Sequence, residues 1–352
     1  MSVNDRAMAG MTRRAAMIGG AATIANAALG SAAIARPSGR MPSVGTITRF
    51  DPALDRLLDS SAPIELIARG YQWAEGPVWV KEGGYLLFSD VPANTVHRWT
   101  AREGAQPFLQ PSGLSGPIPA GIREAGANGL AVDPSGALVM ADSGTRAIAR
   151  VDLATKRKTI LADRYRGKRF NSCNDVTIAR DGTIYFTDPP YGLAEGDSSP
   201  LKELAFNGVY HLRPGGAVEL LDGSLKRPNG IALSPTQDRL YVGCSDESAP
   251  EIRVFDLARD GSVVQGRELV DFTPEFRRGL PGLPDGMKVA RSGHLFASAP
   301  GGLYVLAPDG RKLGLIARGK PIANCAFGED GRTLFMASSD AILRLRLRAK
   351  VA

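Results

Sequence analysis

The chain has 352 residues, of which 43% are hydrophobic and 22% charged, with 41 Gly and 24 Pro. A disordered chain would be poorer in apolar residues, so this composition indicates an ordered globular protein with many turns. The formal charge of +7 is scattered, as in Lys156-Arg157-Lys158, and is expected to lie on solvated surfaces. We therefore expect no nucleic-acid partner.

The first 35 residues predict an export signal. Thr12-Arg13-Arg14 precedes residues 15–35, which carry no charge, are rich in Ala and Gly, and end in Ala33-Ile34-Ala35. This order is typical of secretory signals and favours export over a retained anchor or a disordered cytoplasmic leader, and the arginine pair suggests the twin-arginine type. We expect a periplasmic or secreted protein, an N-terminal extension over residues 36–63, and no stable membrane span once the signal is removed.

From residue 64 to residue 352 the sequence repeats one unit. Each unit has two short strands around a turn rich in Asp, Gly, Pro or Ser, and a third and a fourth strand follow in most units. Four antiparallel strands repeated at intervals of 39 to 56 residues are typical of propeller blades. The sequence therefore predicts an all-β, six-bladed β-propeller. The six units start at Glu75, Asn128, Asn174, Asn229, Asp285 and Asn324.

The two ends of the repeat region predict how the ring closes. Residues 64–70 resemble the fourth strands but precede the first unit, whereas the last unit stops after its third strand, at Arg348. Pairing the early strand with the last blade would remove a free sheet edge. Sustained helical periodicity is missing after the leader, which argues against an α/β barrel.

Other catalytic signatures are weak or missing in the sequence. The cysteines Cys173, Cys244 and Cys325 have no zinc-site spacing and are expected to be small buried residues. His97 and His211 fall in predicted strands away from the channel mouth, so we interpret both as structural. Neither a G-x-S-x-G nor an H-E-x-x-H motif occurs.

The six unit starts predict a metal site. In a propeller the first strand of each blade runs nearest the axis, so these residues should meet at one mouth of the central channel; all six carry carboxylate or carboxamide oxygens. A turn role is an equally good interpretation of Asn128 and Asn324. Two carboxylates in a narrow channel would repel each other, and a bound cation removes that conflict. Oxygen ligands favour Ca²⁺, with Mg²⁺ or Mn²⁺ possible and Zn²⁺ less favoured.

Several motifs also resemble those of a known family. They are Glu75-Gly-Pro-Val-Trp79, the stretch from residue 167 to 193, residues 227–235 and residues 283–289. In this order they are similar to the gluconolactonase and regucalcin (senescence-marker) family of six-bladed calcium propellers, and most similar to its bacterial gluconolactonase branch. The resemblance runs from about Ile64 to Arg348.

This resemblance implies roles for the residues at the mouth. It implies metal ligation by Glu75, Asn229 and Asp285, with Asn174 as a further ligand or a substrate contact, and it makes Asp285 the proton acceptor and donor. Two positions depart from the family pattern: Cys173 stands where Pro is usual, and Ser143 where gluconolactonases often carry His. The metal is expected to survive both changes, but the preferred lactone could differ.

The expected chemistry is hydrolysis of a small sugar lactone. The cation would polarise the carbonyl, and either Asp285 or water bound to the cation would supply the base. The alternatives are hydrolysis of an organophosphate or another ester at the same site, and a calcium-binding propeller without turnover. The sequence indicates no oligomeric state. The expected contacts to sugar hydroxyls are Asn128, Asn174, Asp175 and Tyr191, although the last could serve only a rigid turn.

Overall fold

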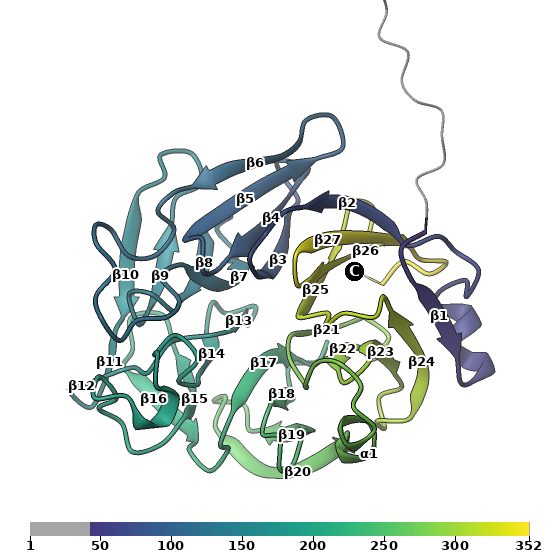
Figure 1. Ribbon diagram of the computed structural model, residues 1–352. Helices are drawn as coiled ribbons and strands as arrows, with labels where there is room; N and C mark the ends of the chain where they lie inside the picture. Colours follow the sequence, from purple (N-terminus) through teal and green to yellow (C-terminus); the bar gives the residue numbers. More distant parts are fainter. Residues whose placement is uncertain (1–42, 352) are drawn as a thin grey trace, which may run out of the picture. The chain divides into compact units, whose positions relative to one another are not determined.

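The strands of the protein are arranged as blades around a central axis (Figure 1). The structure is a computed structural model that describes residues 43–351, so the predicted export signal at residues 1–35 lies outside the described residues. Six antiparallel sheets of four or five strands follow one another around the axis, each with its first strand innermost. The predicted six-bladed β-propeller is therefore confirmed.

Most strands of each blade follow one another in the sequence. The first three blades are β3 (Ala74–Val80), β4 (Tyr85–Asp90), β5 (Thr95–Thr100) and β6 (Gly104–Leu109); β7 (Ala127–Val132), β8 (Leu138–Asp142), β9 (Ala147–Val151) and β10 (Lys158–Ala162); and β13 (Val176–Ile178), β14 (Ile184–Asp188), β15 (Gly208–Leu212) and β16 (Val218–Asp222). A short hairpin of β11 (Arg164–Tyr165) and β12 (Lys168–Arg169) lies between the second and the third.

The last three blades follow the same plan. They are β17 (Pro228–Leu233), β18 (Arg239–Cys244), β19 (Glu251–Leu257) and β20 (Val263–Asp271); β21 (Met287–Val289), β22 (Leu295–Ala299), β23 (Gly302–Leu306) and β24 (Lys312–Ala317); and β25 (Asn324–Gly328), β26 (Thr333–Ser338) and β27 (Ala341–Arg346). A five-residue helix, α1 (Thr273–Arg277), follows β20, and a short 3₁₀ helix (Gly196–Ser198) lies between β14 and β15.

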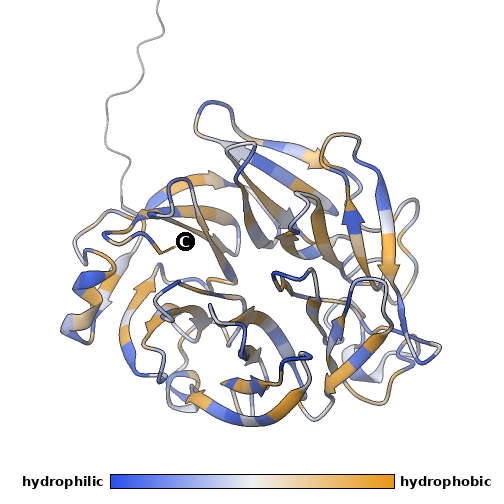
Figure 2. Ribbon diagram, turned by 180° about the vertical axis from the view of Figure 1, so that it is seen from behind, coloured by the Kyte–Doolittle hydropathy of each residue, from blue (hydrophilic) through white to orange (hydrophobic). Residues whose placement is uncertain are grey.

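The position of a strand in its blade determines its burial. The second strands are packed on both faces, and all six residues of β26 are buried. The outer strands alternate between hydrophobic and hydrophilic residues or are largely exposed, as in β10 (Figure 2). The turn between the first two strands repeats one device: Oδ1 of Asp133 accepts the backbone N–H groups of Ser135 and Ala137, at 2.8 and 3.0 Å. The hydrophobic cores consequently lie within and between blades, and the axis is left to polar groups.

The ring closes as the sequence predicts. Strand β2 (Glu65–Arg69) pairs antiparallel with β27, which places Leu66 opposite Leu343 and Glu65 opposite Arg344. The guanidinium of Arg344 lies 2.6 Å from the Glu65 carboxylate. The last blade therefore combines three C-terminal strands with one strand from near the start of the described chain.

One part of the extension adds structure that the sequence did not indicate. Strand β1 (Thr46–Arg49) pairs with β24 as a fifth strand of the fifth blade, and a 3₁₀ helix (Pro52–Arg56) follows it. Leu54 and Leu58 are fully buried there. This strand has only four residues, too few to show a period-2 pattern, so the sequence does not predict it. No helix among residues 43–351 is long and apolar enough to cross a membrane.

The seam between β2 and β27 is expected to contribute strongly to stability. Leu343→Ala should lower the free energy of unfolding by about 2–5 kcal/mol, because it leaves a cavity in a fully packed site. Urea unfolding followed by tryptophan fluorescence measures the change. The control, Val264→Ala, alters a residue that is 68% exposed and should change the free energy by at most about 0.5 kcal/mol. Equal effects of both substitutions would contradict this view of the seam.

Candidate active site

The innermost strands are bent where they carry the predicted site residues. In three blades the pairing of the first and second strands shifts at the polar residue: between Glu75 and Val78, between Ala127 and Leu130, and between Pro228 and Ile231. Such β-bulges redirect side chains. They allow Glu75, Asn128 and Asn229 to face the channel mouth instead of the neighbouring strand.

Close contact between blades explains why Gly follows the polar residue so often. A Cβ on Gly76 would lie 2.0 Å from the carbonyl oxygen of Asn128, and one on Gly230 would lie 2.1 Å from that of Asp285. Each glycine therefore allows one innermost strand to touch the next. This contact brings the polar residues of successive blades together around the mouth.

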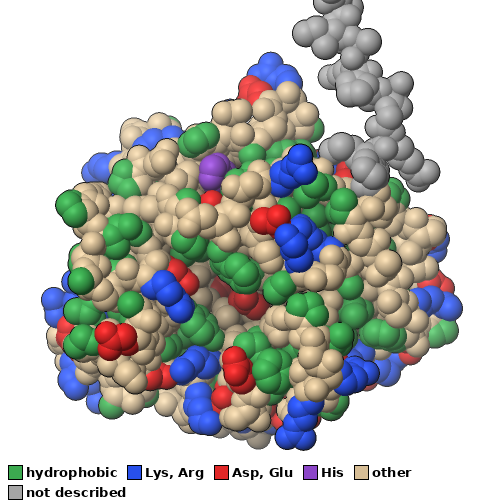
Figure 3. All heavy atoms as spheres, in the orientation of Figure 1, with side chains coloured by type: hydrophobic (Ala, Val, Ile, Leu, Met, Phe, Trp, Pro, Cys, Tyr) green, Lys and Arg blue, Asp and Glu red, His purple; other side chains and the backbone are tan. Residues whose placement is uncertain are grey.

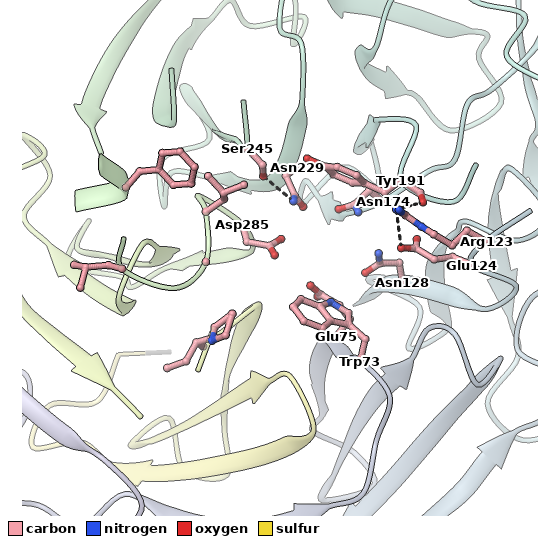
Figure 4. A pocket seen from close by; sticks show the side chains of 16 residues that line it. Trp73, Glu75, Arg123, Glu124, Asn128, Asn174, Tyr191, Asn229, Ser245 and Asp285 are labelled. Carbon is pink, nitrogen blue, oxygen red and sulfur yellow. Dashed lines mark hydrogen bonds and ion pairs between the residues drawn. The ribbon is translucent and has the colours of Figure 1, made fainter. Parts of the chain in front are cut away.

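A cavity of about 460 Å³ opens at this mouth. Figure 3 shows a hollow at the centre of this face, with acidic side chains at its bottom and hydrophobic ones around it. Five of the six unit starts line the cavity, together with Tyr191 (Figure 4). The predicted residues that the structure brings together are Glu75, Asn128, Asn174, Asn229, Asp285 and Tyr191.

Two other predicted residues do not line the cavity. Oδ1 of Asn324 accepts the backbone N–H of Cys325 at 2.8 Å and lies 3.4 Å from Nζ of Lys288. Asp175, expected as a substrate contact, accepts two backbone N–H groups, at 2.9 and 3.2 Å. These bonds occupy Asp175 and Asn324 with partners inside the protein.

Three carboxyl groups meet in this region with little compensating charge. Burial and the charge of Asp175 raise the pKa of Glu75 to about 7. Burial and the charges of Glu75 and Asp175 raise the pKa of Asp285 well above its ordinary value. Burial also raises the pKa of Asp175, and the Lys288 ammonium opposes that shift. A positive charge bound in the pocket would therefore stabilise the ionised carboxylates.

Asn229 presents an oxygen with no partner. Its Nδ2 donates to Oγ of Ser245 at 2.9 Å, and that Oγ donates to the carbonyl oxygen of Pro284 at 2.5 Å. The amide orientation is thereby fixed, and its Oδ1 is buried without a hydrogen-bond partner. Because buried polar atoms are normally satisfied, this oxygen indicates a ligand that accepts its lone pair.

These features fit a hard divalent cation. The carboxylates of Glu75 and Asp285 and the amide oxygens of Asn229 and Asn174 are the donors that Ca²⁺ prefers. A cation would neutralise the carboxylates and satisfy the Asn229 oxygen. Within residues 43–351 no cluster of three or more His, Cys, Asp or Glu side chains could hold a metal. The expected set contains two carboxylates, and its other members are amides.

The cavity also contains residues that the sequence analysis did not single out. Trp73, Arg123, Glu124 and Ser245 line it (Figure 4). Ser245 had a signal, because several second strands end with Ser or Thr beside Asp; the other three lie in loops outside the repeat pattern. An apolar part of the lining comes from Phe276, Leu280, Leu283, Pro321 and Ile322.

The two histidines predicted to be structural and the three cysteines lie outside the cavity lining. His97 stacks on Phe88, with ring centroids 5.3 Å apart. His211 is fully buried, with Nε2 3.2 Å from a carboxylate oxygen of Glu219. Neither histidine lines the cavity. The three cysteines are buried and unbridged.

Comparison with known proteins identifies the family. The sequence matches the SMP-30/gluconolactonase/LRE-like region over residues 73–340. The chain belongs to this family. It is 50% identical over 339 residues to a gluconolactonase of Zymomonas mobilis, which covers 95% of each chain.

Solved structures agree with this assignment. A gluconolactonase of Xanthomonas campestris is 33% identical and matches with a TM-score of 0.74, over 89% of this chain and 99% of that one. The calcium-binding protein regucalcin of Agrobacterium tumefaciens is 17% identical and has a TM-score of 0.63, over 88% of this chain and 96% of that one. The latter likeness concerns the fold. The predicted membership of the gluconolactonase family is confirmed.

The raised pKa of Glu75 predicts how the thermal stability of this protein depends on pH when EDTA keeps metal ions away. The pKa is about 7 in the folded state against an ordinary 4.5, so Glu75 takes up a proton on folding. The stabilisation that this proton gives to the folded state is fully present below about pH 4.5 and is lost as the pH rises through about 7. The melting temperature in EDTA should therefore fall between about pH 5 and pH 8. Calorimetry measures this fall.

Glu75→Gln should flatten that profile, because the amide does not titrate. Glu82→Gln, at an exposed turn of the same blade, is the matched control and should keep the wild-type slope. The interpretation fails if Glu75→Gln and wild type lose the same number of degrees over this range.

Proposed function

We propose that this chain hydrolyses sugar lactones with a divalent cation, most naturally Ca²⁺, held by Glu75, Asn229 and Asp285 together with Asn174. The observation that carries the proposal is the meeting of two buried carboxylates and an unpartnered amide oxygen in one cavity. The lactone-hydrolysing activity is supported by the 50% identity to a protein named gluconolactonase, over nearly the whole of both chains. The chain is therefore an enzyme of the lactonase class.

The reaction requires one proton to move from water to the substrate. The water oxygen bonds to the lactone carbonyl carbon, the bond from that carbon to the ring oxygen breaks, and the ring oxygen becomes a hydroxyl. A divalent cation held by Glu75, Asn229 and Asp285 would supply Lewis acidity toward the lactone carbonyl oxygen. Asp285 accepts the proton from water and returns it to the ring oxygen.

The surroundings of Asp285 suit this role. A cation lowers the basicity of a carboxylate beside it, but burial and the charge of Glu75 act in the opposite direction. Asp285 would thus keep more basicity than an exposed metal ligand. Its loop is held in place because Ser245 donates to the carbonyl oxygen of the preceding Pro284.

The rest of the cavity would orient the lactone ring. Asn128, Asn174 and Tyr191 offer hydrogen bonds to hydroxyl groups, and the apolar lining can pack against C–H groups. We also propose that the reaction takes place in the periplasm or outside the cell, on the basis of the predicted signal at residues 1–35. Cell fractionation, followed by N-terminal sequencing of the protein recovered, would report export and cleavage.

The substitutions Asp285→Asn and Glu75→Gln should reduce activity in different ways. Asp285→Asn keeps an oxygen ligand but loses the base, so kcat should fall about 10²–10⁴-fold even at saturating Ca²⁺. Glu75→Gln removes one charge from the site, so excess Ca²⁺ should restore part of its activity. A pH-stat assay on glucono-1,5-lactone, with EDTA and with added Ca²⁺, measures both.

Wild-type turnover should disappear with EDTA and return with Ca²⁺. Turnover that is indifferent to EDTA, or full activity of Asp285→Asn, would disprove the mechanism. Chelator-sensitive melting without turnover of any lactone or organophosphate ester would favour the non-catalytic calcium-binding alternative.

Ser245→Ala tests whether the Asn229 amide must be held in place. Losing the hydroxyl frees both Asn229 and the Pro284 carbonyl, so Ca²⁺ affinity should fall about 10–100-fold. Calorimetric titration of EDTA-treated, dialysed protein measures this change. The control is Ser248→Ala, whose hydroxyl bonds to Asp246 at an exposed turn. Equal Ca²⁺ affinity in both variants would show that the hydroxyl does not position the ligand.

A further inference from the structure

Glu124 is a carboxylate of the cavity that the proposed mechanism does not use. It lies between β6 and β7, on a segment anchored to the loop of Tyr191. Ile122 pairs with Leu193 in an isolated β-bridge, and the N–H of Arg123 donates to the carbonyl oxygen of Gly192 at 2.8 Å. The main chain at Glu124 is therefore held in place.

The carboxylate of Glu124 lacks hydrogen-bond partners. Its Oε2 is buried without a partner, and its Oε1 lies 3.7 Å from Nη2 of Arg123, which is beyond hydrogen-bond distance. The same Nη2 donates instead to the backbone oxygen of Tyr191. The Glu124 side chain is only 17% exposed, and burial raises its pKa. A nearly buried carboxyl group without hydrogen bonds is costly unless a ligand supplies them.

The position of Glu124 limits which part of a ligand it can contact. Figure 4 shows its carboxylate on the cavity wall beside Arg123 and Asn128, apart from Asp285. Glu124 therefore lies apart from Asp285, where substituents of the ring would sit if a cation held by Glu75 and Asp285 bound the reacting carbonyl oxygen.

We propose that Glu124 hydrogen-bonds to ring hydroxyl groups and makes the site selective for polyhydroxylated lactones. This inference rests on the proposed lactone hydrolysis. A hydroxylated ring donates hydrogen bonds to the carboxylate, whereas a ring without hydroxyls leaves it with only the 3.7 Å ion pair to Arg123. Sites built in this way discriminate strongly against analogues that lack the hydroxyl.

The test compares two six-membered lactones that differ in hydroxylation, glucono-1,5-lactone and δ-valerolactone. Glu124→Met keeps the side-chain length without an oxygen, and Glu124→Gln keeps one acceptor. In Glu124→Met, kcat/KM for gluconolactone should fall about 10–100-fold, mainly through KM. The value for valerolactone should change by less than about 3-fold. Glu124→Gln should fall between wild type and Glu124→Met on gluconolactone.

Glu82→Gln serves as the matched control, and the melting temperature and Ca²⁺ affinity of every variant show whether the site is intact. If Glu124→Met leaves kcat/KM unchanged for both lactones, the inference is wrong while lactone hydrolysis stands. An equal loss on both lactones also overturns it, because the role would then be general to catalysis. If wild type hydrolyses neither lactone, the proposed function is wrong and the inference falls with it.

Discussion

The site depends on the close approach of the innermost strands around the axis. At Gly76 and Gly230 a neighbouring carbonyl oxygen occupies the space that a Cβ would need. Blades that pack this tightly cannot fill the axis with apolar side chains, so the hydrophobic clusters lie within and between blades. The mouth of the channel is consequently left to polar residues, and five of the six unit starts, four of them directly before a glycine, line the cavity there.

That geometry creates an electrostatic cost which the fold does not remove. Burial and mutual repulsion disfavour the ionised forms of three carboxyl groups, those of Glu75, Asp175 and Asp285. Internal hydrogen bonds and Lys288 satisfy Asp175, but Glu75 and Asp285 face the cavity. Retaining such a cluster is understandable where a cation completes it, and the same charge would then be available to activate a carbonyl group.

Hydrogen bonds between blades keep this arrangement rigid. A hydroxyl at or near the end of a second strand donates to a carbonyl on the first-strand side of the next blade: Ser89 to Asn128 at 2.8 Å, Thr187 to Asn229 at 2.6 Å and Ser245 to Pro284 at 2.5 Å. Each bond fixes a backbone atom at or beside a residue of the mouth. The geometry of the mouth therefore follows from the packing between blades, which is a rigid basis for the proposed metal ligands.

The repeat in the sequence by itself determined the number of blades, the closing strand and most of the cavity's polar residues, because blade symmetry converts spacing along the chain into position around the axis. It could not determine which of those residues face a ligand. Asn324 is a unit start like the residues that line the cavity, and Asp175 stands beside another, but both bond inside the protein. Only the tertiary structure placed Glu124, Arg123 and Trp73 in the cavity, because they reach it from loops that no repeat constrains.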